Sequence, residues 1–88
     1  MMQSEFEEML GEKVSASDYA IIDFVYTWHP TISNTRGKQQ IVSLYKSGGM
    51  DLMKNLLSVA AMQAVAEENM IFETAKAQVK KLLEQYGG

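Results

Sequence analysis

The sequence predicts an all-α protein, a small bundle of about four to five helices that ends in a long C-terminal helical region, either straight or bent. Apolar residues recur at spacings of three and four, which is the periodicity of one face of an α-helix. Two serines are each followed three residues later by an acidic side chain, a pattern typical of helix starts. The strict apolar–polar alternation of a half-buried strand is not seen.

Length and composition indicate a single globular domain, residues 1–88. One hydrophobic core usually serves a chain of 88 residues, and 47% hydrophobic with 22% charged residues excludes a disordered chain. The absence of cysteine excludes disulfides and thiolate metal sites, and the single histidine, His29, argues against structural zinc. Because so small a domain generally needs a disulfide, a metal or self-association, we expect an oligomer.

Two helices are expected in the first part of the chain. The first begins at Ser4 and ends at Gly11, a residue suited to the left-handed conformation that closes a helix. The second begins after Ser15 and ends near Trp28, because proline follows one residue later. A strand is the alternative over 21–26, which is rich in β-branched and aromatic residues, but the apolar positions there do not alternate.

A third helix is expected to begin at Ser33 or Thr35 and to continue to about Lys46. The glycine pair at 48–49 is the strongest break in the chain, since paired glycines suit a helix end followed by a turn. The first three helices would together form a compact helical portion over residues 4–47.

A long helical portion is expected over residues 50–86, which contain neither glycine nor proline. The sequence leaves open whether this is one helix or two helices that meet near 67–69. Its second half is amphipathic, with apolar residues spaced alternately three and four apart, as in a short coiled coil or a bundle helix. These residues are Phe72, Ala75, Val79, Leu82 and Tyr86.

We interpret the chain as a non-catalytic helical module for protein interaction or self-assembly. Its partner would be a second copy, giving a homo-oligomer, or another helical protein, and binding would bury apolar side chains between helices without chemistry. The expected interface consists of apolar side chains of the long helical portion. They are Leu52, Leu56, Val59, Phe72, Ala75, Val79, Leu82 and Tyr86.

A small helix-turn-helix DNA-binding accessory protein, which would use the basic segment 31–46, is the alternative. The first 29 residues carry six acids and one base, whereas residues 31–46 carry three bases and no acid. The candidate contacts to phosphates or bases are Arg36, Lys38, Gln39 and Lys46. The net charge of −3 opposes this function, so nucleic acid is the less favoured partner.

An enzyme is the least favoured interpretation. Gly37 and Lys38 resemble part of a phosphate-binding loop, but Ile32 replaces the first glycine of that motif and Gln39 its serine or threonine. No local motif supplies a nucleophile for His29 to activate. We therefore expect no catalytic residue, no metal and no cofactor.

Targeting and membrane segments are not expected either. The first residues lack the basic start and the apolar run of a signal peptide. The most hydrophobic stretch, 52–66, is interrupted by polar residues and is shorter than the ~20 apolar residues that a membrane helix needs. These features predict a cytoplasmic protein.

Overall fold

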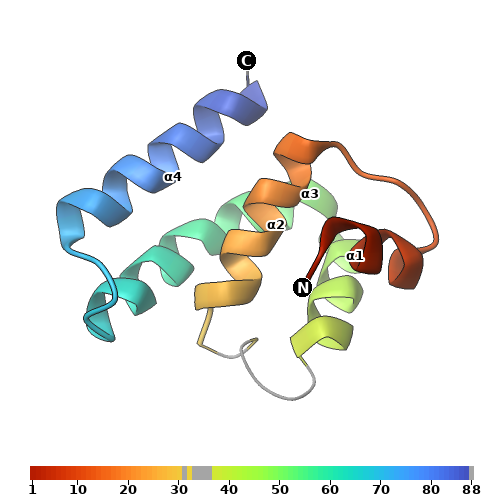
Figure 1. The fold of residues 1–88 in the computed structure, drawn as a ribbon, viewed down its shortest axis with the longest axis horizontal. Coiled ribbons are helices and arrows are strands. Elements are labelled where there is room, and N and C mark those ends of the chain that lie inside the picture. The colour runs from red at the N-terminus through yellow and green to blue at the C-terminus, as the bar shows by residue number, and fades with distance from the viewer. Residues whose placement is uncertain (31, 33–36, 88) are drawn as a thin grey trace.

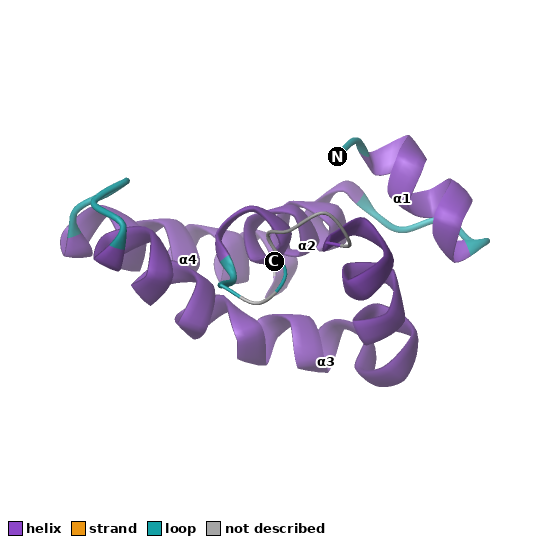
Figure 2. Cartoon of the chain, turned by 90° about the horizontal axis from the view of Figure 1, so that it is seen from below, coloured by secondary structure: helices purple, strands orange, loops and turns teal. Residues whose placement is uncertain are grey.

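The computed structural model describes residues 1–30, 32 and 37–87. Four helices form this part of the chain: α1 (Gln3–Leu10), α2 (Ala16–Trp28), α3 (Gly37–Ala66) and α4 (Phe72–Gly87) (Figure 1). None of the described residues lies in a strand, as Figure 2 also shows. The prediction of an all-α bundle of about four to five helices is therefore confirmed, and the strand considered over 21–26 is replaced by helix α2.

The first two helices differ in how they begin. Ser15 caps α2 as expected, because its Oγ accepts a hydrogen bond from the Asp18 backbone N–H at 3.1 Å. The Ser4 cap was wrong, since α1 begins after Met2 without a side-chain cap. The expected capping partner, Glu7, instead accepts the backbone N–H of Val14 at 2.9 Å and so holds the loop before α2.

The longest helix, α3, lies in the middle of the chain and not at its C-terminus, which corrects the prediction. It contains the glycine pair 48–49, where we expected the helix to end. Gly49 has non-helical angles, φ 62° and ψ −156°, so two helical segments meet there at a kink. Glycine is the only residue that adopts these angles without strain, and the second segment starts directly after it. The predicted caps Ser33 and Thr35 lie outside the described residues.

A turn at 67–71 divides the expected C-terminal portion 50–86 into the second half of α3 and the separate helix α4. The backbone N–H of Asn69 donates to the Ala64 carbonyl, and that of Glu68 donates to the Val65 carbonyl, both at 3.0 Å. Together with the positive φ of Glu68, 60°, this pattern is a Schellman motif. Glycine usually occupies the position of Glu68, and because it is absent the sequence left open whether 50–86 form one helix or two helices that meet near 67–69. The structure shows two.

The core forms around α2, which packs against both α3 and α4, while α1 packs against α3. Figures 1 and 2 both place α1 and α4 at opposite ends of the molecule. The Phe6 ring joins α1 to the core, lying edge-on to Tyr45 with 5.6 Å between ring centroids. The largest fully buried side chains come from all regions except α4. They are Phe6, Ile21, Ile22, Val25, Ile32, Ile41, Met53 and Leu57.

Polar contacts hold α1 against the rest of the chain. The Tyr19 hydroxyl donates to the Met1 carbonyl at 2.8 Å. An ion pair joins Lys38 Nζ at the start of α3 to Glu5 Oε2 of α1 at 2.8 Å. Burial raises the pKa of Tyr19 to about 12, with a further contribution from the carboxylates of Asp23 and Glu5. The neutral phenol is therefore the form that the folded chain favours.

Replacing Gly49 by alanine should lower the free energy of unfolding by about 1–3 kcal/mol, because a side chain at these backbone angles is strained. A Cβ at this position meets no atom within 4 Å, so crowding adds nothing to the cost. Urea unfolding followed by circular dichroism measures the change. Ser47→Ala, at an exposed helical position of α3, is the control and should stay within about 0.5 kcal/mol of wild type. An equal, small effect of both substitutions would contradict the kink.

Stability should fall between pH 10 and pH 12. The phenol of Tyr19 has a folded pKa of about 12 against an ordinary value of 10.0, so its contribution is complete below pH 10 and is lost as the pH rises towards 12. Urea midpoints measured across this range test the expectation. The Tyr19→Phe variant should show a smaller fall, and an identical pH dependence of the two proteins would refute the assignment.

Candidate functional site

Helix α4 carries two apolar rows that face different surroundings. The inner row points into the core, where Ala75 and Leu82 are 2% and 5% exposed. The second row lies beside it on the same helix, at spacings that keep its side chains on one face. Its apolar members Phe72 and Leu83 are 49% and 39% exposed, and Val79 between them is half-buried. The inner row is therefore buried in the core, whereas the second row contacts the core only through Val79 and leaves Phe72 and Leu83 exposed.

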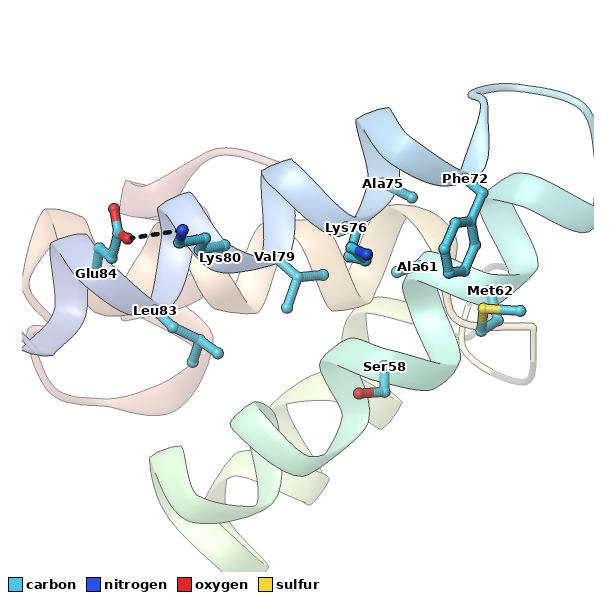
Figure 3. A pocket seen from close by; sticks show the side chains of 10 residues that line it. All are labelled: Ser58, Ala61, Met62, Phe72, Ala75, Lys76, Val79, Lys80, Leu83 and Glu84. Carbon is cyan, nitrogen blue, oxygen red and sulfur yellow. Dashed lines mark ion pairs between the residues drawn. The ribbon is translucent and has the colours of Figure 1, made fainter.

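The second row forms one wall of an open groove of about 530 Å³ between α3 and α4. Figure 3 shows the two helices diverging from the turn that joins them, with the side chains of this row directed towards α3. Small residues, Ser58 and Ala61, contribute to the α3 wall, which also carries the flexible side chain of Met62. The groove is therefore apolar, and its walls are two helices.

Charged side chains of α4 also contribute to the groove. Lys76 Nζ lies 5.5 Å from the centroid of the Phe72 ring, close enough for a cation–π contact, so the lysine stem covers part of the ring. Lys80 Nζ lies 4.0 Å from Glu84 Oε1, one helical turn further along. This exposed pair is weak, and both side chains remain free to meet other charges.

Exposed apolar residues gather at this end of the molecule. Met62 is 54% exposed, and Ile71, directly before α4, is 70% exposed. Val59, one turn before Met62 on α3, is 46% exposed. Single exposed apolar residues are ordinary, but Met62, Phe72 and Leu83 are exposed and line the same groove, which is typical of an interaction surface.

The structure divides the eight interface residues expected from the sequence into three groups. Ala75 and Leu82 are buried in the core of the chain itself. Leu52, Leu56, Val79 and Tyr86 are half-buried, and they pack against the core. Val59 and Phe72 are exposed. Of the eight residues, Phe72, Ala75 and Val79 line the groove.

Sequence reasoning missed Met62 and Leu83. The sequence does contain a signal for Leu83, because Leu83 continues a row at helical spacing. The row consists of Phe72, Lys76, Val79 and Leu83, at intervals of four, three and four residues. The lysine within that row hid it, since a single charge interrupts the apolar pattern. For Met62 there was no signal, because the first half of the long portion is apolar around much of its circumference and does not distinguish an exposed face.

The residues proposed for nucleic-acid contacts are partly engaged within the chain. Lys38 is paired with Glu5, and the hydrogen bond between them raises the pKa of Lys38 and lowers that of Glu5. Gln39 and Lys46 are exposed on α3. Arg36 lies outside the described residues. Lys38, the candidate contact at the start of α3, is therefore already paired with the Glu5 carboxylate of α1.

Two titratable side chains at α2 are shielded from water. His29 is 9% exposed, and burial lowers its pKa. Asp23 is half-buried, and burial raises its pKa. Both shifts favour the neutral form, as expected for groups beside an apolar core. Within the described ranges, no three or more His, Cys, Asp or Glu side chains are grouped so that they could hold a metal ion.

Of the helices in the described part of the chain, none combines the length and the hydropathy of a membrane span. Comparison of the chain with protein-family models, with curated proteins and with solved structures gave no match.

Alanine substitution of two neighbouring leucines, Leu82 and Leu83, should show that the two rows of α4 contribute differently to stability. Leu82→Ala is expected to cost about 2–5 kcal/mol, because it removes a buried side chain and leaves a cavity. Leu83→Ala should change stability by less than about 1 kcal/mol, since Leu83 is 39% exposed. Urea unfolding of the two variants gives the comparison, and equal costs would show that the groove-facing row is part of the core.

Proposed function

We propose that the chain is a non-catalytic protein-interaction module that binds an apolar helical face of a protein partner in the groove between α3 and α4. The observation that carries the proposal is the second apolar row of α4, which lines this groove and whose members Phe72 and Leu83 are exposed. Burying its side chains would remove apolar surface from water at a gain of about 25 cal/mol per Å².

The shape of the groove favours a helix as the occupant. Its walls are helices that diverge from a turn, so a third helix can lie between them, as in a bundle (Figure 3). The small side chains of Ser58 and Ala61 leave room for a large apolar side chain of the partner. Met62 lies on the α3 wall near Phe72 and the turn, whereas Leu83 lies at the far end of the α4 wall, so the two offer apolar contacts along the length of the groove (Figure 3).

Photocrosslinking from inside the groove tests the proposal. A photoreactive phenylalanine analogue replaces Met62 in the full chain, and the protein is irradiated in the cells that produce it. We expect a defined crosslinked protein, which mass spectrometry identifies. The matched control places the same analogue at Met9 of α1, which is exposed but distant from the groove, and should give no such product.

A second substitution tests whether the crosslink depends on an intact apolar groove. Leu83→Glu introduces a charge on the opposite wall at a position that is 39% exposed, so the fold should persist, as circular dichroism can verify. Loss of the crosslink from position 62 in this variant would support the proposal. An unchanged crosslink, or equal crosslinking from positions 62 and 9, would rule it out.

A further inference from the structure

We infer that the occupant of the groove is a second copy of this chain, whose α4 lies antiparallel to the first α4 around a twofold axis. This inference rests on the proposed function and names its partner. It is carried by the charge pattern of the groove-facing side of α4, which is complementary to itself in one orientation only.

The groove-facing row has the spacing of a helix-pairing seam. Phe72, Lys76, Val79 and Leu83 follow one another at intervals of four, three and four residues, as the a and d positions of a heptad do. In an antiparallel pair, Phe72 of one copy lies opposite Leu83 of the other. Lys76 then lies opposite Val79, and the same contacts are repeated by the twofold symmetry.

Charges beside the seam match in this arrangement. Glu73 and Lys80 each directly follow a seam residue, so both lie along the same edge of the seam. In the antiparallel register given above, Glu73 of each copy lies beside Lys80 of the other. Two equivalent ion pairs of opposite charge therefore flank the contact. Both side chains are exposed in the single chain and available for such pairing.

The parallel orientation lacks this match. Parallel pairing would place Lys76 of one copy against Lys76 of the other in the middle of the seam, where like charges repel. In the antiparallel pair the stem of Lys76 packs against Val79 instead. Its ammonium group can keep its position near the Phe72 ring, 5.5 Å from the centroid, and reach solvent.

The α3 wall adds to the same contact. Met62 lies on the wall that faces Phe72, so it can pack against Leu83 of the second copy. One α4 of 16 residues and the edge of α3 give an interface at the small end of the specific class. We therefore expect a dimer with a Kd in the micromolar range.

Sedimentation equilibrium of the full chain from about 5 to 500 µM tests the inference, since this range brackets a micromolar Kd. We expect a monomer–dimer equilibrium for wild type. Glu73→Lys and Lys80→Glu should each weaken the dimer roughly tenfold or more, because each places like charges beside one another twice. The double variant Glu73→Lys/Lys80→Glu restores opposite charges and should return the Kd to within about threefold of wild type.

Lys81→Glu is the matched control, because it makes the same charge change on α4 away from the seam and should leave the Kd within about threefold. Circular dichroism of each variant verifies that α4 remains folded. If the Kd of the dimer is unchanged by either single charge reversal, the antiparallel pairing is overturned. It is also overturned if the double variant is folded but its Kd does not return towards the wild-type value. A monomer throughout the range, with a crosslink from position 62 to a different protein, would overturn the second copy as partner while the proposed function stands. A monomer throughout the range, with no crosslink from position 62, would overturn both the second copy as partner and the proposed function.

Discussion

The reversal of the chain between α3 and α4 is the constraint on which the shape of the molecule depends. The Schellman motif at Glu68 ends α3, and the turn at 67–71 directs α4 back towards α2 and α3. Without this reversal, the inner row of α4 would have no surface within the chain to cover. With it, Ala75 and Leu82 complete the core, and the two diverging helices leave a groove between them.

The function proposed for the groove follows from a surplus of apolar surface on α4. A helix of 16 residues that packs on one side of a small bundle buries one apolar row, and a second row remains in contact with water. Lys76 covers part of that row by lying over Phe72, which limits the exposed apolar area of the free chain. The same lysine can move its stem onto a partner without losing its own hydration. Such a surface is compatible with both a free and a bound state.

The contacts that hold α1 lie at the opposite end of the molecule from α4. α2 is the apolar centre, and the aromatic contact between Phe6 and Tyr45 holds α1 on α3 together with the Glu5–Lys38 ion pair. The kink at Gly49 lets the two segments of α3 take different directions. One segment meets α1, and the other forms a wall of the groove, so the single glycine lies between the end of the molecule that holds α1 and the end that carries the groove.

The sequence by itself determined the class of fold, the cap of α2 at Ser15, the departure from helical geometry at the glycine pair and the amphipathic character of α4. Each of these is local, because it depends on residues within one or two helical turns. Tertiary structure decided which apolar row of α4 is core and which is exposed, since two rows at helical spacing are equivalent until a neighbouring helix covers one of them. It also decided between one helix and two over 50–86, through the left-handed conformation of Glu68, and it paired Lys38 with Glu5, 33 positions apart in the chain. No local pattern carries that information, because it arises only when distant segments pack.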